Sequence, residues 1–289
     1  MINYYLKYKT RKISSIPPSA DDIKESGKIL FSIFTRYGDT IIDLMVIKEF
    51  VKKYPNKDYL IICPKQMEPY VKEFLPNLKC KAFNKRNLFE LAKVIQLLKN
   101  ERFDIGFNPW SNGLDSCYFI SFCKNFLFYK DFVRPSNINH YQVVRRYLQL
   151  PEKRWKVNDL SLQENYTKIL ICPHSTDSNR SLPIEKMNQI IFELQDTYNR
   201  PEIVIASMDK SYFRDDCQKF IFEKSDYSSK QFLKLMRESS LVVCSDSGPL
   251  HIALALKKDL LAFMISTDPE IVINTGSSLT INYPKSLCL

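Results

Sequence analysis

The sequence predicts an α/β fold with two doubly wound domains in tandem. Apolar, strand-like runs alternate with helix-like segments along most of the 289 residues, which is typical of parallel sheets with helical crossovers. A polar segment with a proline, QLPEKRWKVND at 149–159, interrupts the alternation, which then starts again. Two such domains are expected to face each other across a cleft at the carboxyl ends of their strands, where these folds bind ligands.

The composition is that of a globular protein. Hydrophobic residues make up 45% of the chain, enough for sizeable cores. No run of about 18 apolar residues occurs, so we expect no membrane span, and the N-terminus lacks the apolar segment of a secretory signal. Eight cysteines occur without a CxxC pair, which favours buried free thiols in a reducing cytoplasm over disulfides or a metal site.

The first half is expected to hold an arm and one α/β domain. Residues 1–26 are basic, poor in apolar residues and contain a Pro pair, so we expect an irregular or loosely docked extension. Residues 27–155 are assigned to the first domain. Its predicted strands are 28–34, 58–63 and 103–108, and its predicted helices are 40–53, 69–75 and 87–101.

The second half repeats the alternation and is assigned to a second domain, 156–289. Its predicted strands are 167–172, 202–207, 240–245 and 260–265. Its predicted helices are 182–198, 229–239 and 249–258. Pro183 and Pro249 each fall in the first turn of a predicted helix, a position that tolerates proline.

The net charge of +10 is unevenly distributed. Residues 1–155 hold 27 Lys and Arg against 15 Asp and Glu, or +12, whereas residues 156–289 hold 15 against 17, or −2. A basic half joined to a near-neutral half suggests that the first half meets an anionic surface. Each cation near an anionic lipid leaflet contributes roughly 1 kcal/mol. The candidate clusters are 79–86, 145–146 and 153–156, and a solvated surface is the alternative for each of them.

The stretch CSDSGPLHIALAL, 244–256, links a predicted strand to an apolar helix. A helix N-terminus with unpaired N–H groups suits a phosphate or diphosphate, and Gly248 lets the backbone approach it closely. His251, one turn into the helix, is a plausible partner for phosphate or ribose. The alternative is that Asp246 or Ser247 merely caps the helix.

Two further loops occupy equivalent positions after strands. PHSTDSNRSLP, 173–183, combines hydroxyl groups with Arg180, which is typical of anion recognition but also of an ordinary surface loop. TRYGDTI, 35–41, places Gly38 in a turn and Asp39 at a helix start. Asp39 is either an N-cap or a general base facing the cleft, a role that contributes about 10²–10⁴-fold in rate.

The loop FNPWSNGLD, 107–115, follows another strand of the first half. Asn108, Trp110 and Asn112 are candidates to line the acceptor side of the cleft, and a Trp packed into a structural loop is the alternative.

Together these loops resemble glycosyltransferase family 9, the ADP-heptose:lipopolysaccharide heptosyltransferases of GT-B fold. The resemblance covers roughly residues 28–270 and is carried by three segments, of which the D-[ST]-G-P-x-H core is the most specific. They are KILFSIFTRYGDTIIDLMVIKEFVKKYP, ILICPHSTDSNRSLPIEKMNQII and VVCSDSGPLHIALAL.

The resemblance implies a metal-independent, inverting transfer of a sugar from a nucleotide donor, with no cofactor. Asp39 matches the family's base, with Gly38, Thr40, Asn108 and Trp110 on the acceptor side. Arg180 stands where the family usually has a phosphate-contacting Lys. The implied donor-binding residues are Ser175, Thr176, Arg180, Asp246, Ser247, Gly248, Pro249, Leu250 and His251.

The implied donor is ADP-heptose and the implied acceptor a phosphorylated glycolipid, the lipopolysaccharide or lipooligosaccharide core. The enzyme would then act in the cytoplasm, as a peripheral protein on the inner face of the cytoplasmic membrane, with its basic half toward the anionic leaflet. A relative that uses another nucleotide sugar, or epimerises one, and a non-catalytic protein that binds nucleotide or lipid headgroup are the alternatives. Nucleic-acid binding is not expected, because no reading module or aromatic–basic interleaving is present.

Overall fold

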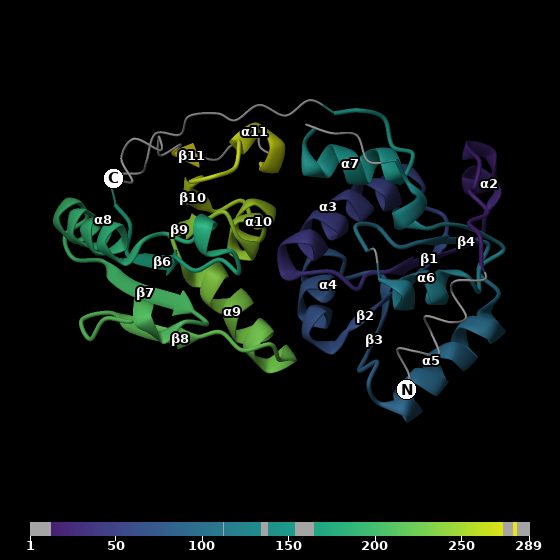
Figure 1. Ribbon diagram of the computed structural model, residues 1–289, viewed down its shortest axis with the longest axis horizontal. Helices are drawn as coiled ribbons and strands as arrows, with labels where there is room; N and C mark the ends of the chain where they lie inside the picture. Colours follow the sequence, from purple (N-terminus) through teal and green to yellow (C-terminus); the bar gives the residue numbers. More distant parts are fainter. Residues whose placement is uncertain (1–12, 112, 134–137, 154–164, 274–279, 282–289) are drawn as a thin grey trace. The chain divides into compact units, whose positions relative to one another are not determined.

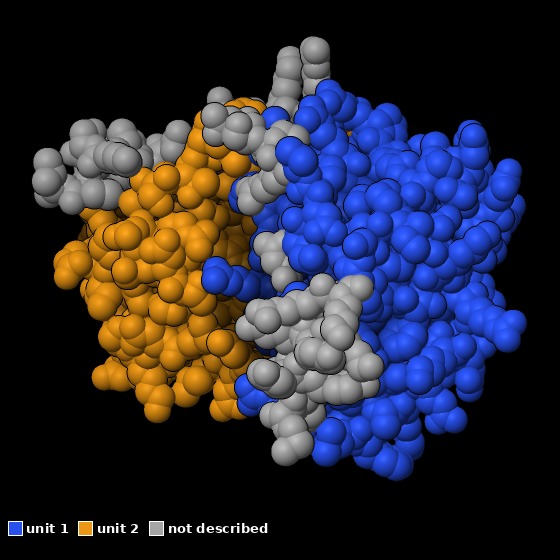
Figure 2. Space-filling view, turned by 45° about the vertical axis from the view of Figure 1, so that its right-hand side comes forward, with its two compact units in different colours: residues 1–152 blue, residues 153–289 orange. Residues whose placement is uncertain are grey.

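The computed structural model describes residues 13–111, 113–133, 138–153, 165–273 and 280–281 (Figure 1). The chain divides into two compact units, residues 1–152 and 153–289 (Figure 2). The boundary expected at 155/156 falls outside the described residues, as does most of the basic cluster 153–156. Each unit is described separately below.

Unit 1 is a five-stranded parallel sheet with helices packed against it. The strand order is β3-β2-β1-β4-β5. Its strands are β1 (Lys28–Ser32), β2 (Asp58–Pro64), β3 (Lys79–Phe83), β4 (Ile105–Phe107) and β5 (Asn125–Leu127). Its helices are α2 (Ala20–Glu25), α3 (Tyr37–Lys53), α4 (Glu68–Phe74), α5 (Leu88–Glu101), α6 (Leu114–Ile120) and α7 (His140–Tyr147), with 3-10 turns η1 (Lys65–Met67) and η2 (Tyr129–Asp131).

The central strands are apolar on both faces, as expected when helices cover a parallel sheet. In β1, Phe31 is fully buried and its ring packs against Phe50 of α3, Tyr59 of β2 and Phe107 of β4, with centroid distances of 5.7–6.2 Å. This aromatic cluster fixes α3 against the sheet, and α3 in turn carries Asp39.

The N-terminal arm is not loosely docked over its described part, so that expectation is wrong for residues 13–26. Ile16 forms an antiparallel bridge with Phe126 of β5. Ser19 and Asp22 make a capping box that starts α2, and Ile23 of this helix is fully buried. The low apolar content misled the prediction, because one buried Ile and a backbone bridge suffice to attach the segment.

Unit 2 is a six-stranded parallel sheet of the same kind. Its strand order is β11-β10-β9-β6-β7-β8. The strands are β6 (Lys168–Cys172), β7 (Glu202–Ser207), β8 (Gln218–Ile221), β9 (Leu241–Ser245), β10 (Asp259–Phe263) and β11 (Thr280–Ile281). The helices are α8 (Ile184–Thr197), α9 (Asp226–Glu238), α10 (Gly248–Ala255) and α11 (Pro269–Val272), with η3 (Ser178–Arg180) and η4 (Lys210–Tyr212).

The two units share one topology. Counted along the chain within each unit, both sheets run third, second, first, fourth, fifth, and unit 2 adds a sixth strand. The order therefore reverses beside the first strand, between β1 and β4 and between β6 and β9. Doubly wound sheets bind ligands outside the carboxyl ends of the strands at this reversal. The predicted α/β class with two doubly wound units is confirmed.

We predict that the docking of α2 stabilises unit 1. Ile23→Ala removes a fully buried side chain and should lower the free energy of unfolding by about 2–5 kcal/mol. Ile16→Ala, at a side chain that is 52% exposed, is the matched control and should change it by less than about 1 kcal/mol. Urea unfolding of both variants checks this, and an equally small effect for both would mean that α2 adds no packing energy.

Candidate functional site

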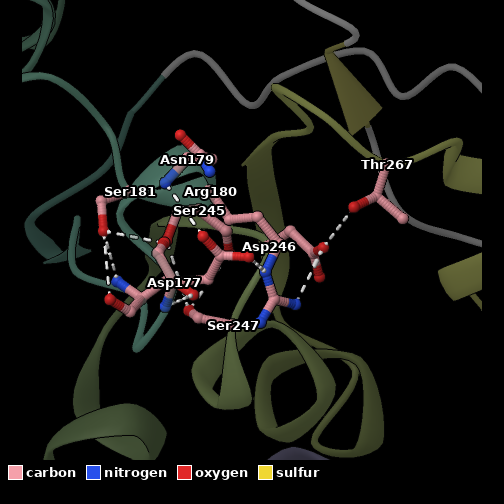
Figure 3. Close-up of polar contacts among 9 residues, drawn as sticks. Asp177, Asn179, Arg180, Ser181, Ser245, Asp246, Ser247 and Thr267 are labelled. Carbon is pink, nitrogen blue, oxygen red and sulfur yellow. Dashed lines mark hydrogen bonds and ion pairs between the residues drawn. The ribbon is translucent and has the colours of Figure 1, made fainter.

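In unit 2, the loops that leave β6 and β9 meet around one buried carboxylate. Asp246 follows β9, is only 3% exposed, and is held by side chains from two other strand exits (Figure 3). Nη1 of Arg180, after β6, lies 3.3 Å from its Oδ2. Thr267, after β10, donates its hydroxyl to the same oxygen at 2.7 Å. Asp246 therefore ties three strand exits together.

Arg180 is oriented by carboxylates on two sides. Its Nε lies 3.6 Å from Oδ2 of Asp177, in the same loop, and the other contact is to Asp246. The side chain is 29% exposed, so part of the guanidinium faces solvent. A planar cation held this way presents its remaining N–H donors in a fixed direction, which suits a phosphate oxygen.

The 173–183 loop is organised by its own hydroxyl groups. Ser181 Oγ accepts from the backbone N–H of Ser175 at 2.9 Å and donates to its carbonyl at 3.2 Å. Ser175 is buried, so its role in this structure is to hold the loop. Thr176, the next residue, is exposed. Of these two predicted donor-binding residues, Thr176 is the one whose side chain solvent reaches.

The N-terminus of α10 is not closed by a side-chain cap. Ser247 is the N-cap residue, but its side chain makes no capping hydrogen bond and instead donates to the Ser245 carbonyl at 3.2 Å. Asp246 is engaged by Arg180 and Thr267, so the capping alternative is wrong for both residues. Of the first three residues of α10, Pro249 has no N–H and Leu250 donates its N–H to the Ser247 carbonyl, so Gly248 is the one whose N–H has no acceptor within the helix. The helix dipole adds positive potential there, so an anion is favoured at this end.

The remaining predicted donor residues lie in the first turns of α10. Gly248 and Pro249 are half-buried and leave the entrance of the helix free of long side chains. Leu250 is fully buried and its N–H donates to the Ser247 carbonyl, so it packs the helix onto the unit. His251 is 6% exposed.

In unit 1, Asp39 occupies the third position of α3. The N-cap is Arg36, without a side-chain capping bond, so the alternative that Asp39 is the N-cap is wrong. Asp39 is half-buried and lies in the first helical turn after the exit of β1. A carboxylate in the first turn of a helix is stabilised by the helix dipole.

Two predicted acceptor-side neighbours of Asp39 have structural roles. Gly38 was expected to permit a tight turn, but it lies within the first turn of α3, and none of the described glycines has a positive φ. Thr40 is fully buried and its hydroxyl lies 2.8 Å from that of Thr35, joining the loop to the helix. The expectation that the Thr40 side chain faces an acceptor is therefore wrong.

The assignment of Asn108 to the acceptor side is also wrong. Asn108 is fully buried; its Oδ1 accepts from the Tyr129 N–H at 2.9 Å and the Tyr147 hydroxyl at 3.1 Å. Its Nδ2 donates to the Ser111 carbonyl and the Ser116 hydroxyl, both at 3.0 Å. With its hydrogen-bonding capacity used internally, Asn108 fixes the β4 exit loop.

Trp110 has a conformation that belongs to the same loop structure. Its φ is 52°, in the left-handed region, and its half-buried ring packs 5.7 Å from Tyr129 and 5.0 Å from His140. These contacts favour the packed-Trp alternative over acceptor binding. Asn112 lies outside the described residues.

Asp43, one turn along α3 from Asp39, was missed by the sequence reasoning. It is fully buried, and neither carboxyl oxygen has a hydrogen-bond partner among the described residues. Burial, followed by the nearby charge of Asp39, holds the pKa of Asp43 well above its usual value of 3.8. The Asp43 carboxyl therefore loses its proton less readily than an ordinary Asp. Val46, Ile47 and Phe50, which are three, four and seven residues further along α3, are buried core residues, and this helical spacing is the one signal that marked Asp43 as a core position.

Thr267 was missed as well, because a Ser-Thr-Asp turn before Pro269 carries no specific motif. The signal available was its place after the predicted strand 260–265, because the loops of the site also follow predicted strands; in the sheet this strand, β10, lies beside β9. One basic cluster, 145–146, was misjudged in part: Arg145 is 5% exposed and paired with Glu49, so it is not available to an anionic surface, whereas Arg146 is exposed.

Within the described residues, no group of three or more His, Cys, Asp or Glu side chains is arranged to hold a metal ion. No helix in the described part of the chain is both long and apolar enough to cross a membrane. The seven cysteines in that part are free thiols.

Comparison with known proteins identifies the family of the chain. The model of glycosyltransferase family 9 (heptosyltransferase) matches residues 134–286, more than half of the chain. No curated protein sequence matches at a significant level. The protein therefore belongs, through its family model, to glycosyltransferase family 9 and is a glycosyltransferase.

Solved structures share the fold at low sequence identity. The Escherichia coli ADP-heptose LPS heptosyltransferase II superposes with a TM-score of 0.65 at 15% identity, covering 89% of this chain and 91% of that one. A family 9 glycosyltransferase from Veillonella parvula DSM 2008 gives 0.64 at 14%, covering 91% and 89%. The E. coli heptosyltransferase WaaC, solved with ADP-2-deoxy-2-fluoro heptose, gives 0.57 at 10%, covering 89% and 93%. The fold is thus of the GT-B type.

We predict that Asp43 makes unit 1 less stable as the pH rises. Its pKa is raised in the folded protein, so between about pH 4 and that raised value the folded state binds more protons than the unfolded state, and stability falls with increasing pH. Asp43→Asn removes this dependence. The variant should therefore gain stability relative to the native protein above about pH 4, by up to about 1.4 kcal/mol per pH unit.

Urea unfolding across this pH range measures the difference. Asp21→Asn, at an α2 side chain that is 79% exposed, is the control and should show a small difference without this rise. A difference for Asp43→Asn that stays constant with pH would mean that Asp43 is ionised in the folded protein.

Proposed function

We propose that this glycosyltransferase transfers heptose from ADP-heptose to a lipopolysaccharide or lipooligosaccharide core by direct displacement with inversion. The observation that carries the proposal is the cluster of Arg180, Asp246 and Thr267 beside the uncapped N-terminus of α10. Membership of a heptosyltransferase family supports the choice of sugar, as does the ADP-heptose analogue named for the E. coli enzyme of the same fold.

The donor would bind through its diphosphate. The Gly248 N–H at the start of α10 and the solvent-facing donors of Arg180 would take the phosphate oxygens, and Asp246 would keep the guanidinium in place. These groups also stabilise the negative charge that grows on the diphosphate as the bond to the anomeric carbon breaks. In this scheme no metal or cofactor takes part.

Asp39 would act as the general base on the acceptor. It removes the proton from the attacking hydroxyl, the hydroxyl oxygen forms the new bond to the anomeric carbon, and ADP departs with the electron pair of the broken bond. Attack from the face opposite the diphosphate inverts the configuration. The acceptor, a phosphorylated glycolipid, would be met in the cytoplasm at the inner face of the cytoplasmic membrane, toward which the basic first half would be turned.

The direct test is transfer of radiolabelled ADP-heptose to heptose-deficient lipooligosaccharide. The native protein should transfer label, and Asp39→Asn should lower kcat by about 10²–10⁴-fold while ADP binding is retained. Asp43→Asn, the same substitution one turn along the same helix, is the matched control and should keep its activity because Asp43 is buried away from the solvent.

The outcomes separate the alternatives. Transfer from UDP- or GDP-sugars but not from ADP-heptose would replace the donor and keep the mechanism. ADP binding without transfer from any donor, and without an effect of Asp39→Asn, would identify a non-catalytic binding protein. Equal activity in the native and Asp39→Asn proteins would overturn the role of Asp39.

Arg180 provides a second prediction. Arg180→Ala should weaken ADP binding about 10–100-fold, because a charge-assisted contact to phosphate is lost and Asp246 is left buried without its cation. Lys234→Ala removes a cation of unit 2 that is 77% exposed and serves as the control, with binding unchanged. Isothermal titration with ADP measures both variants, and unaltered affinity in Arg180→Ala would place the diphosphate elsewhere.

A further inference from the structure

Two large apolar side chains stand exposed next to each other at the start of α5. Leu88 and Phe89, the first two residues of this helix, are 67% and 68% exposed. Most of the α5 surface follows the usual division, with Leu91, Val94 and Leu98 buried against the sheet. Leu88 and Phe89 instead place apolar side chains on the exposed surface of the helix. Adjacent exposed apolar side chains mark interaction surfaces more often than isolated ones do.

The pair is held in a defined position. The Asn87 side chain caps α5 by accepting from the N–H groups of Phe89 and Glu90. Glu90 in turn accepts from the Asn84 N–H and from Lys65, each at 2.7 Å. The loop and the first helical turn are therefore cross-linked on both sides, so Leu88 and Phe89 are presented from a fixed turn.

Cations surround this turn. Lys93 lies over the Phe89 ring, with Nζ 4.1 Å from its centroid, and Arg86 is exposed two residues before Leu88. We define the α5 tip as Lys65, Lys81, Lys85, Arg86, Leu88, Phe89, Glu90, Lys93 and the neighbouring Asp115. It contains five cations and two acids, an excess of three positive charges.

The α5 tip lies at the functional edge of unit 1. It follows β3 at its carboxyl end, and parallel strands place their carboxyl ends on one edge of the sheet. Lys85 joins it to the neighbouring loops, because its ammonium group pairs with Asp115 of α6 and lies 5.8 Å from the ring of Phe34. Phe34 belongs to the segment between β1 and α3, which leads to Asp39.

We propose that the α5 tip docks on an anionic lipid bilayer, with Leu88 and Phe89 inserted among the headgroups and the surrounding cations on lipid phosphates. A helix end that combines apolar side chains with Lys and Arg has the chemistry of interfacial membrane binding. The proposal rests on the proposed function in one respect: a lipid-linked acceptor gives the edge that bears Asp39 a reason to meet the membrane.

A second exposed aromatic shows why the surroundings matter. Phe192 of α8 is 72% exposed, but its neighbours on the helix include Glu193 and Asp196, which an anionic surface repels. Phe192 is therefore the matched control: a side chain of the same type and similar exposure, on a helix, in acidic surroundings.

The test is flotation of the full chain with vesicles of phosphatidylethanolamine and phosphatidylglycerol, compared with phosphatidylcholine vesicles. The native protein should float with the anionic vesicles and lose this binding at high salt. The double variant Leu88→Ser/Phe89→Ser should partition at least about tenfold less, as should Arg86→Glu/Lys93→Glu. Phe192→Ser should bind as the native protein does. Circular dichroism checks that each variant is folded.

Sugar transfer separates this proposal from the proposed function. With an acceptor in vesicles, Leu88→Ser/Phe89→Ser should lose transfer in parallel with binding, while transfer to a deacylated, soluble acceptor should stay at the native rate. If the native protein ignores anionic vesicles, or the α5 variants bind as well as it does, the docking proposal is overturned whether or not transfer occurs. If vesicle binding falls as expected but no protein transfers sugar, the docking proposal stands and the proposed function falls.

Discussion

The reversal of strand order beside the first strand of each sheet is the constraint on which the rest of the site depends. A crossover helix must leave each strand and return on one face, so at the reversal two neighbouring helices leave toward opposite faces and their loops part. In unit 2 the strands at the reversal are β6 and β9, and Arg180 and Asp246 from their two exit loops pair across the space between these loops. In unit 1 the reversal puts the start of α3, and with it Asp39, at the equivalent place.

Two buried carboxyl groups show how surroundings assign different roles to one residue type. Asp246 is 3% exposed but receives a guanidinium and a hydroxyl, so its charge is compensated and it can orient Arg180. Asp43 is fully buried and its carboxyl oxygens have no hydrogen-bond partner among the described residues, so burial raises its pKa. Asp39 is half-buried in the first turn of the same helix, where the helix dipole stabilises a carboxylate.

Much of the fold could be predicted because the central strands are continuous apolar runs bounded by polar turns. Four strands, β3, β5, β8 and β11, and four helices, α2, α6, α7 and α11, went unpredicted. β8, QKFI, is largely exposed and β5 has three residues, so neither shows a hydrophobic periodicity. The loops of the site were located by sequence, since strand exits are readable. The structural roles of Asn108 and Thr40 could not be predicted from the sequence. A polar residue whose side chain is buried and hydrogen-bonded internally cannot be distinguished by sequence from one whose side chain faces a ligand. Thr267 and Asp43 required the tertiary contacts themselves.

A crystal structure of the protein with ADP tests the central claim most directly, because the claim concerns where one diphosphate lies. The account predicts phosphate oxygens within about 3 Å of the Gly248 N–H at the start of α10 and of the Arg180 guanidinium, with the Arg180–Asp246 pair still formed. ADP bound with its phosphates away from the β6 and β9 exits, or an Arg180 that turns from them to Asp246 alone, would contradict it.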